Sequence, residues 1–501
     1  MTSGPTLVDV LRRAESVYGD AVAYRDRGDV RTYRELASGV RRATRLLEER
    51  GVRAGDRVVL AAENGRDFLE WTFAAAWRGA VLVPLNWRLA PPEVASQFDL
   101  VEPALAIAAP PFAELVRSGS ERARRSVPFV DATARADAES GAPEPVDESD
   151  LAHLYCTSGT TGEPKGVELT HRNVCQHALA AIAELGISDR DTWGHVAPMF
   201  HLADAWATVA ITLAGGTHVA LPRFDAAAAL DLFERERVTI SNLVPTMLVA
   251  MCARPDVERR DLSAFRLVLS GGASIDPATV RRVERAFRCE YVQTYGMTET
   301  SPYLTLSRLG PAERELPEDE RFRLRARTGR PFLGVDLRVV DEQGRDVPRD
   351  DRAVGEIVVR GATVMRGYFG RPDLTEAVMR AGWLSTGDLA RIDARGFVEI
   401  VDRKKDMVVT GGENVYTTEV EKVLYAHAAV LEAAVFGRAD ERWGERVCAA
   451  VVLRPGATLD VDALLAHCRE HLAAYKCPRE VRFLAELPRT GTGKIAKRLL
   501  R

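Results

Sequence analysis

Hydrophobic residues in the first hundred positions recur at the spacings of amphipathic helices and short buried strands. Thr32 and Glu35 form a candidate capping box, and apolar residues then repeat at helical spacing as far as Gly51. The next expected elements are a strand, a helix and a second strand, at 57–62, 68–77 and 80–84. This alternation predicts a mainly parallel sheet covered by helices.

The middle third of the chain continues the alternation. An apolar strand at 151–155 precedes a stretch rich in glycine and hydroxyl residues, and a helix is expected just beyond it at 173–185. Three further strand and helix pairs are expected at 219–221 with 226–236, at 240–244 with 245–252, and at 267–270 with 277–287. The sheet is therefore predicted to run through this region, whereas the polar segment 135–150 is predicted to be a surface loop.

From Gly329 onward the pattern changes to short strands separated by glycine turns, which predicts a β-rich subdomain. A strand at 397–401 runs into the charged segment 402–406, where we place the joint between two domains. The last hundred residues alternate again and can form a small α+β unit. Its expected elements are a helix capped near Thr418 and Glu421, strands at 433–436 and 447–453, and a helix ending near Tyr475. The predicted domains are residues 1–402 and 403–501.

The composition of the chain indicates which kinds of molecule it can bind. The chain has 501 residues, of which 46% are hydrophobic and 28% charged, as in a folded globular protein. A net charge of -4 argues against binding to nucleic acid or acidic membranes and favours small-molecule partners. The chain contains neither an apolar run of about 20 residues nor an apolar signal core at its start, so a cytoplasmic protein is expected. Seven scattered cysteines without a CxxC pair predict reduced thiols.

The segment 155–166, YCTSGTTGEPKG, holds the residue types that a loop around a polyphosphate requires. Glycines let backbone N–H groups approach an anion, hydroxyls add donors, and Lys165 adds a positive charge. The P-loop pattern fails here because Pro164 stands where its second glycine should be. On this segment alone, a surface turn rich in threonine and glycine remains an alternative.

Six separated segments together resemble the superfamily of AMP-forming adenylating enzymes, which includes acyl-CoA synthetases, carrier-protein adenylation domains and luciferases. The segments are 155–166, Pro198-Met199-Phe200-His201, 293–299 (QTYGMTE), 385–388 (STGD), 402–406 (DRKKD) and 488–494 (PRTGTGK). The resemblance spans essentially the whole chain and is closest to an acyl-CoA synthetase. It implies an α/β fold with a large N-terminal domain and a small mobile C-terminal domain that carries the catalytic lysine.

The resemblance also implies cofactors and site residues. ATP, Mg²⁺ and CoA are the expected cofactors, and Glu299 is the expected Mg²⁺ ligand, with Thr298 beside it as a phosphate donor. Nucleotide or CoA contacts are implied for Thr157, Ser158, Gly159, Thr160, Thr161, Gly162, Lys165, Gly271, Gly272, Ala273, Gln293, Thr294, Tyr295, Gly296, Met297, Asp388, Arg403, Lys405, Gly411, Gly412 and Glu413.

Four of these residues have specific implied roles. Asp388 would accept the ribose hydroxyls, Arg403 would contact ribose or phosphate, Lys405 would be the hinge, and Lys494 would act in the transition state of adenylation. Taken singly, Glu299 could be a solvated acid at a helix start, Asp388 a turn residue, Arg403 part of a solvated charged run and Lys494 a structural lysine of the tail. Only their shared register with the other segments favours the chemical interpretation.

His201 occupies the position of the residue that gates the acid-binding tunnel in the family, although a lone histidine is more often a core residue. Asp204 stands where many relatives have an apolar residue or glycine, which argues against a purely apolar fatty-acid pocket. Trp206, Tyr303 and Cys289 are candidates to line the pocket, with core packing the favoured interpretation of each.

The predicted reaction is a two-step ligation in which a carboxylic acid and ATP give acyl-AMP, and CoA then gives acyl-CoA and AMP. A free-standing enzyme that loads a carrier protein is an alternative, and so is transfer to an amine or another non-thiol acceptor. A nucleotide-binding regulator without turnover is disfavoured by the joint presence of Glu299, Asp388, Arg403 and Lys494. The acid and the oligomeric state stay open.

Overall fold

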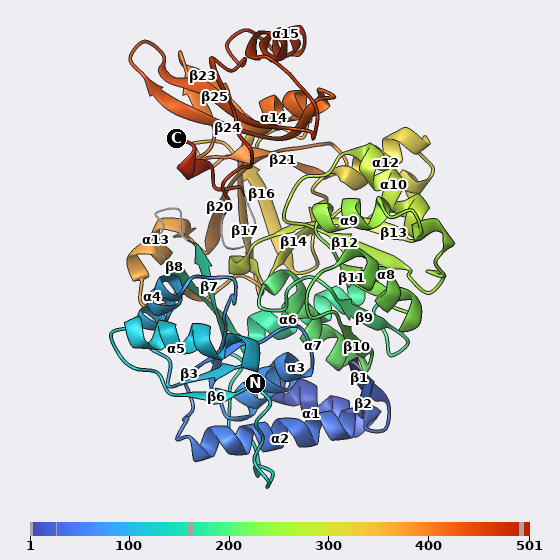
Figure 1. Cartoon of the computed structure of the whole chain (residues 1–501), viewed down its shortest axis with the longest axis vertical. Coiled ribbons are helices and arrows are strands. Elements are labelled where there is room, and N and C mark those ends of the chain that lie inside the picture. The colour runs from blue at the N-terminus through green and yellow to red at the C-terminus, as the bar shows by residue number, and fades with distance from the viewer. Residues whose placement is uncertain (1–3, 27, 159–163, 490–494) are drawn as a thin grey trace. The chain divides into compact units, whose positions relative to one another are not determined.

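The computed structural model describes residues 4–26, 28–158, 164–489 and 495–501 (Figure 1). The chain divides into two compact units, Met1–Leu337 with Val359–Leu384, and Arg338–Val358 with Ser385–Arg501. The division falls within three strands of a five-stranded sheet. This sheet contains β16 (Val335–Val340), β17 (Gly355–Gly361), β19 (Met379–Arg380), β20 (Trp383–Ile392) and β21 (Val398–Arg403). The joint placed after residue 402 stays a prediction.

A seven-stranded sheet in the first unit has the order β18-β8-β7-β4-β3-β5-β6. Strands β7, β4, β3, β5 and β6 are parallel, whereas β8 and β18 pair in the antiparallel direction. The bounds are β3 (Arg57–Ala61), β4 (Val81–Pro84), β5 (Leu105–Ala108), β6 (Phe129–Asp131), β7 (Leu151–Ser158), β8 (Pro164–Thr170) and β18 (Gly367–Tyr368). The central strands are buried on both faces and are correspondingly apolar.

A nine-stranded sheet forms the other half of this unit, in the order β15-β14-β13-β12-β11-β9-β10-β1-β2. Its strands from β13 to β1 are parallel, and β14, β15 and β2 are antiparallel to their neighbours. The bounds are β1 (Val22–Asp26), β2 (Asp29–Thr32), β9 (Thr192–His195), β10 (Thr217–Ala220), β11 (Ile240–Asn242), β12 (Leu267–Ser270), β13 (Glu290–Gly296), β14 (Tyr303–Leu306) and β15 (Arg330–Pro331).

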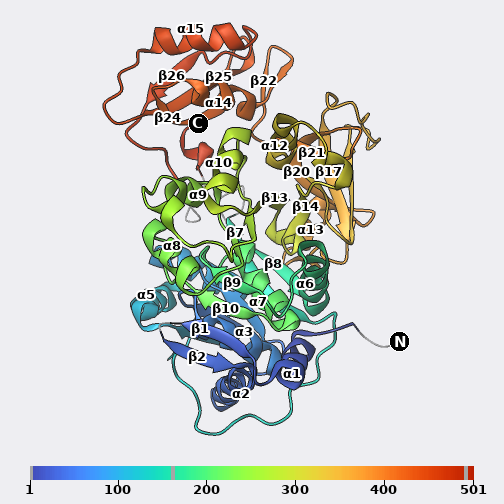
Figure 2. The same ribbon diagram turned by 90° about the vertical axis from the view of Figure 1, so that its right-hand side faces the viewer.

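Helices cover these sheets, and α1, α2 and α3 pack on one another beside them (Figures 1 and 2). The predicted capping box of α2 is present, because Thr32 accepts from the amide of Glu35 while the Glu35 carboxylate accepts from the amide of Thr32. The helices of the unit are α1 (Leu7–Tyr18), α2 (Tyr33–Glu49), α3 (Arg66–Trp77), α4 (Pro91–Val101), α5 (Ala113–Arg122), α6 (His171–Leu185), α7 (Leu202–Ala214), α8 (Ala226–Arg235), α9 (Pro245–Cys252), α10 (Pro277–Phe287), α11 (Pro311–Arg314), α12 (Glu318–Ala326) and α13 (Pro372–Val378). Short 3₁₀ turns are η1 (Pro110–Phe112), η2 (Val257–Arg259) and η3 (Thr298–Thr300). The predicted α/β class is confirmed.

In the second unit, a small group of helices and strands follows β21 in the chain. Its own sheet has the order β23-β22-β25-β24, with β26 parallel to β25. The bounds are β22 (Val408–Thr410), β23 (Glu413–Val415), β24 (Val430–Asp440), β25 (Gly444–Leu453), β26 (Glu480–Phe483), α14 (Thr417–Ala426), α15 (Val461–His471) and η4 (Lys497–Leu499). A separate apolar core, which includes Val435, Val451 and Leu464, lies between this sheet and the two helices.

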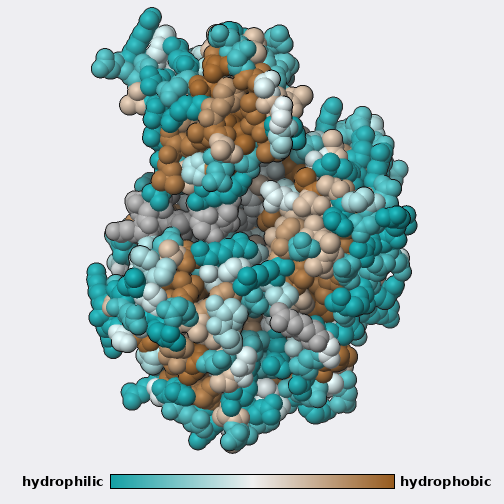
Figure 3. All heavy atoms as spheres, viewed as in Figure 1, coloured by the Kyte–Doolittle hydropathy of each residue, from teal (hydrophilic) through white to brown (hydrophobic). Residues whose placement is uncertain are grey.

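Hydrophobic residues also reach the surface of this second unit. Figure 3 shows them gathered over the part of the molecule that contains β24 and β25, next to hydrophilic surface. Large apolar side chains exposed in the unit include Val409, Tyr425, Leu431 and Leu499. Apolar surface of this kind is common where a domain makes contacts that are not permanent.

Two local expectations were wrong. The glycine-rich segment was expected between a strand and a helix, but β8 lies before α6 and pairs with β7 as a hairpin. The period-two alternation of Val167, Glu168 and Leu169 is the signal that was missed. Thr418 does not cap α14 with its side chain, because its hydroxyl donates to the Val401 carbonyl and Tyr416 is the N-cap residue.

Candidate functional site

The β7–β8 hairpin holds the described ends of the predicted phosphate loop. Thr157 of β7 and Lys165 of β8 are directly opposite each other in the register of the pair. The Lys165 ammonium lies 4.9 Å from the centre of the Tyr368 ring, a cation–π distance. Gly159, Thr160, Thr161, Gly162 and Lys494 lie outside the described residues, and Ser158 is described by its backbone alone.

Tyr368 links this hairpin to Glu299. Its hydroxyl donates to Glu299 Oε1 at 2.9 Å, and the backbone carbonyl of Glu299 accepts from the amide of Met365 at 2.8 Å. Burial, followed by the Glu299 charge, raises the pKa of Tyr368, so the phenol keeps its proton and stays a donor. Glu299 is itself only 9% exposed. Tyr368 therefore contacts Lys165 through its ring and Glu299 through its hydroxyl.

Sequence reasoning missed Tyr368. The residue belongs to β18, which is two residues long and has no readable periodicity. Only its pairing with β8, where Tyr368 is opposite Val167, places it beside the glycine-rich segment. A contact set by the register of distant strands leaves no local signal in the chain.

The ends of the parallel neighbours β12 and β13 bring together four predicted residues. Thr294 Oγ1 donates to the Ser270 carbonyl at 3.1 Å, and Gln293 Nε2 donates to the Ala273 carbonyl at 2.9 Å. A Cβ on Gly271 would lie 2.4 Å from Thr294 Oγ1, so only glycine fits there. Ligands of open parallel sheets bind beyond such strand ends.

The turn after β12 and the chain from β13 to η3 carry further predicted residues of this unit. Gly272 has a φ of +82° in the turn after β12. The half-buried or exposed residues Tyr295, Gly296, Met297 and Thr298 follow the buried Thr294 and precede the buried Glu299. They are therefore the accessible part of the segment.

His201 is the N-cap residue of α7 and is half-buried, with its Nδ1 accepting weakly from the Ala203 amide at 3.5 Å. This places the imidazole at the start of a helix whose first turn contains Asp204. The preceding Phe200 is buried and its ring meets the Trp87 ring edge to face. The tunnel-gating role of His201 stays a prediction.

Asp204 has a different environment from the one inferred from sequence. It is fully buried, and its Oδ2 lies 2.6 Å from His195 Nδ1 while its Oδ1 accepts from Trp193 Nε1 at 3.3 Å. His195 Nε2 lies 3.0 Å from His218 Nδ1, and His218 Nε2 lies 3.1 Å from the Thr212 hydroxyl.

Burial holds the pKa of His218 well below its usual value, so this ring is neutral. Both oxygens of Asp204 are thus engaged in a buried network that fastens α7 to β9 and β10. Asp204 therefore has a structural role in this network, and its effect on the polarity of the acid pocket stays a prediction. Two histidines in neighbouring strands were the available but unused signal: His195 lies nine residues before Asp204 and His218 fourteen residues after it.

Trp206, Tyr303 and Cys289 belong to the core, as favoured from the sequence. Trp206 is 2% exposed, Tyr303 is 3% exposed and Cys289 is 8% exposed. The Trp206 and Tyr303 rings lie 5.2 Å apart and both pack against His177. These distances are typical of close-packed aromatic clusters.

In the second unit, Asp388 and Arg403 are opposite each other in the β20–β21 pair. Arg403 Nε lies 3.3 Å from Asp388 Oδ1, and the Asp388 side chain is 10% exposed whereas that of Arg403 is 53% exposed. The nearby Lys404 pairs with Glu356 at 2.9 Å, and Lys405 follows in the exposed turn after β21. One buried carboxylate and one accessible guanidinium therefore stand side by side.

Asp402 is the buried member of the same charged segment. Its carboxylate accepts from the amide of Thr417 and from the Thr417 hydroxyl, the latter at 3.1 Å, at the start of α14. Burial raises its pKa. Asp402 thus accepts hydrogen bonds at the N-terminus of α14, where backbone N–H groups have no partner within the helix. Its role is structural.

Gly411 and Gly412 form the two-residue turn of the β22–β23 hairpin, and both have positive φ, at +61° and +86°. The amide of Gly411 donates to the Trp443 carbonyl at 2.8 Å, and a Cβ on Gly411 would lie 2.9 Å from the Trp443 ring. Glu413 follows and is exposed. The turn presents backbone and a carboxylate to solvent beside an indole.

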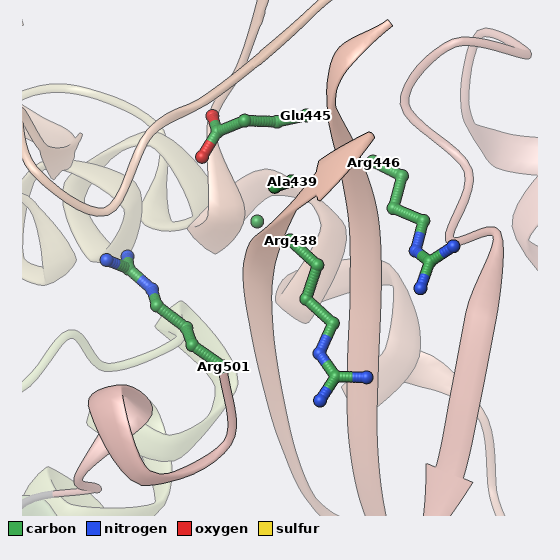
Figure 4. Close-up of a pocket in the computed structure, with 6 residues that line it drawn as sticks. Arg438, Ala439, Glu445, Arg446 and Arg501 are labelled. Carbon is green, nitrogen blue, oxygen red and sulfur yellow. The ribbon is translucent and has the colours of Figure 1, made fainter. Parts of the chain in front are cut away.

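An open pocket of about 470 Å³ lies in the second unit (Figure 4). Arg438 and Arg446 are opposite each other in β24 and β25, and Figure 4 shows their side chains extending in the same direction, with Arg501 reaching in from the last turn of the chain. Glu480 accepts from both strand arginines, at 3.1 and 3.2 Å. Arg438, Arg446 and Glu480 were not singled out from the sequence.

All seven cysteines are free thiols, in agreement with the expectation from their spacing. Along the described ranges, no helix has the length and apolar character that a membrane crossing needs.

Two family models match the chain. Residues 11–369 match the AMP-binding enzyme family, and residues 419–494 match the AMP-binding enzyme C-terminal domain. The chain is 40% identical over 481 residues to a feruloyl-CoA synthase of Amycolatopsis sp, covering 95% of this chain and 94% of that protein. It is 34% identical over 522 residues to 4-hydroxybutyrate--CoA ligase 2 of Metallosphaera sedula, covering 98% and 93%.

Solved structures agree over the whole length. The o-succinylbenzoate CoA synthetase MenE from Bacillus subtilis, in complex with its acyl-adenylate intermediate, matches with a TM-score of 0.88 and 29% identity, covering 100% of this chain and 99% of that one. The amide bond synthetase McbA from Marinactinospora thermotolerans matches with a TM-score of 0.87 and 29% identity, covering 99% of each chain. The predicted resemblance is confirmed, and the chain belongs to the AMP-binding enzyme family.

Proposed function

We propose that the residues described above carry the two half-reactions of an acid–thiol ligase. The chain is an adenylate-forming acid–CoA ligase that uses ATP, Mg²⁺ and CoA. In the first step a carboxylate oxygen attacks the α-phosphorus of ATP and pyrophosphate leaves, giving acyl-AMP. In the second step the CoA thiol attacks the acyl carbonyl, a proton leaves the sulfur, and AMP departs.

The observation that carries the assignment of the site is the convergence of Lys165, Tyr368 and Glu299 beside the glycine-rich segment. A carboxylate is a hard oxygen ligand of the kind that Mg²⁺ prefers, and its donor Tyr368 fixes its direction. Bound Mg²⁺ supplies charge neutralisation for the phosphates. Lys165 adds positive charge on the same side, since its ammonium lies over the Tyr368 ring.

The other predicted residues have environments suited to nucleotide binding. Asp388 can accept from both ribose hydroxyls, with Arg403 at 3.3 Å orienting its carboxylate. Gly271, Gly272 and Ala273 leave room beside Gln293 and Thr294 for a flat ring, because no side chain projects from the two glycines. Tyr295, Gly296 and Met297 line the accessible continuation of that edge.

We assign the two steps to two positions of the C-terminal domain, related by rotation at Lys405. Lys494 serves the adenylation step alone, as a preorganised cation for the transition state. The Gly411–Gly412 turn with Glu413 serves the thiol step, where the pantetheine arm needs a surface without bulky side chains. The exposed position of Lys405 after β21 supports a hinge there.

The acid is proposed only as a class. The relatives named above act on an aromatic and a short hydroxy acid, and an indoleacetate--CoA ligase of Aromatoleum aromaticum is 36% identical over 481 residues. Small aromatic acids are therefore the first candidates, because the relatives at 40% and 36% identity act on acids of this class. CoA is the favoured acceptor, and a carrier protein or an amine is the alternative, the latter because McbA shares the fold. We place the enzyme in the cytoplasm.

A panel of acids tests this function through ATP-dependent release of pyrophosphate, with and without CoA. We expect one aromatic or hydroxylated acid to release pyrophosphate and to yield AMP and acyl-CoA. Glu299→Gln should lower the rate of pyrophosphate release at least about 100-fold, because the uncharged amide is a poor Mg²⁺ ligand. Glu313→Gln is the matched control, since Glu313 is equally buried at 8% exposure and has no assigned role. Release of ADP in place of AMP would contradict the proposal.

A further inference from the structure

Helix α15 of the second unit carries a cluster of metal-ligating side chains that includes none of the residues assigned above. His467, Glu470 and His471 occupy positions i, i+3 and i+4 of α15, on one face of the helix. One ligand atom from each lies within 4.8 Å of the other two. His467 is half-buried, and the other two are exposed, so the cluster is open to solvent.

The hydrogen bonds of the two imidazoles decide which nitrogens are available. His467 Nε2 lies 2.9 Å from the Val423 carbonyl of α14, and His471 Nδ1 lies 2.9 Å from the His467 carbonyl. A carbonyl only accepts, so each of these nitrogens carries the proton. In the neutral rings, the lone pairs are therefore on His467 Nδ1 and His471 Nε2.

We propose that His467, Glu470 and His471 form a binding site for a late divalent transition metal, with Zn²⁺ as the representative ion. Two imidazole nitrogens and one carboxylate oxygen are the donor set of Zn²⁺, Ni²⁺ or Cu²⁺, whereas Mg²⁺ and Ca²⁺ require more oxygen ligands. Histidines four residues apart on a helix can chelate one ion without a change of backbone. The carbonyl partners are the outer hydrogen bonds that orient metal-binding histidines.

His427 is close by but differs in its chemistry. Its ring lies 5.1 Å from that of His467, and its Nδ1 accepts from the amide of Ala429 at 3.2 Å. The neutral ring then has its proton on Nε2, and neither nitrogen offers a lone pair to the site. His427 is therefore a matched control that removes an adjacent imidazole without removing a ligand.

The bound ion would have a structural effect, because His467 also joins α15 to α14 through Val423. A metal held by residues at the end of α15 fixes the last turn of that helix against α14. The site contains none of the residues assigned to ATP, acid or CoA. Its failure would therefore leave the proposed ligase function unchanged.

The test is a titration of the full-length, chelator-treated protein with Zn²⁺ by calorimetry in Mg²⁺-containing buffer. We expect one site, a loss of affinity of at least about tenfold in His471→Ala and in His467→Ala, and a change below about threefold in His427→Ala. Circular dichroism checks that each variant is folded. Absence of Zn²⁺ binding by the unaltered protein, or equal affinity of the His467→Ala/His471→Ala double variant, would overturn the site. An equal loss in His427→Ala would also overturn it, since the tautomer argument would then be wrong.

Discussion

The predicted site residues of the two units differ in how firmly the fold holds them. In the first unit, Gln293, Thr294 and Glu299 are 5%, 4% and 9% exposed. Gln293 and Thr294 donate hydrogen bonds to the Ala273 and Ser270 carbonyls, and Glu299 accepts one from the Tyr368 hydroxyl. In the second unit, the Arg403 side chain is 53% exposed, and Gly411 to Glu413 form an exposed turn. Burial keeps a site preorganised through both steps of the reaction. Exposed residues can instead contact the substrate in one step and leave it before the next.

This comparison predicts two kinds of mutational effect. A substitution in the buried framework of the first unit should lower the free energy of unfolding and both half-reactions together. A substitution among the exposed residues of the second unit should affect one half-reaction and leave stability almost unchanged, because surface substitutions usually shift stability by less than about 0.5 kcal/mol.

The largest effect is expected for Asp204→Ala. It removes the carboxylate that His195 and Trp193 contact in a fully buried site, and each buried donor left without an acceptor costs about 1–3 kcal/mol. Urea unfolding followed by circular dichroism measures this loss. Asp189→Ala is the control, because Asp189 is exposed, and it should change stability by less than about 0.5 kcal/mol. Equal stability of both variants would contradict the structural role of the network.

Lys494→Ala should give the opposite pattern. Loss of one preorganised donor lowers rate by about 10²- to 10³-fold, so pyrophosphate exchange should fall by this factor. Conversion of supplied acyl-AMP to acyl-CoA should stay within about twofold, and the urea midpoint should not move, if the lysine serves adenylation alone. Arg498→Ala is a control for the basic tail. An equal loss of both half-reactions would contradict the assignment of Lys494 to adenylation alone.

Lys405→Pro tests the hinge. Proline fixes φ and would restrict rotation at this position, while the other residues with proposed ATP contacts are unchanged. Pyrophosphate exchange should be preserved, and thioester formation should fall by about 10²-fold, the loss typical of a misplaced catalytic group. Lys405→Ala, which keeps backbone freedom, should retain both steps. Normal overall turnover by the proline variant would place the hinge elsewhere.

Much of the framework was predictable from local pattern, and the contacts that complete the site were not. Helix α9, strand β12 and helix α10 lie at the residues predicted for them, because proline at the first helical positions and continuous apolar runs mark their ends. The partners of Asp204 and the position of Tyr368 depend on register between strands far apart in the chain. The residues that fall outside the described ranges keep their roles as predictions.

The smallest effect concerns two buried histidines of the first unit that differ in their partners. His195 is engaged through both ring nitrogens, whereas neither nitrogen of His153 has a partner among the described residues. Burial lowers the pKa of His153 from 6.5 to about 3. The unfolded chain therefore binds a proton between pH 6.5 and about pH 3 that the folded chain does not, so stability is lost as pH falls through this window.

His153→Leu should remove that dependence. Below pH 6.5, the slope of the unfolding free energy against pH should decrease by up to about 1.4 kcal/mol per pH unit. This is the slope expected when unfolding binds one proton. At pH 8 the two proteins should differ little, because replacing an unpartnered buried polar group by an apolar one of similar size is nearly neutral. His195→Leu is the comparison variant. It leaves the buried Asp204 carboxylate without its imidazole partner, so it should destabilise the fold at pH 8 as well. Urea midpoints of the three proteins from pH 5 to pH 8 decide the matter, and an unchanged slope in His153→Leu would mean that this imidazole is not held neutral by burial.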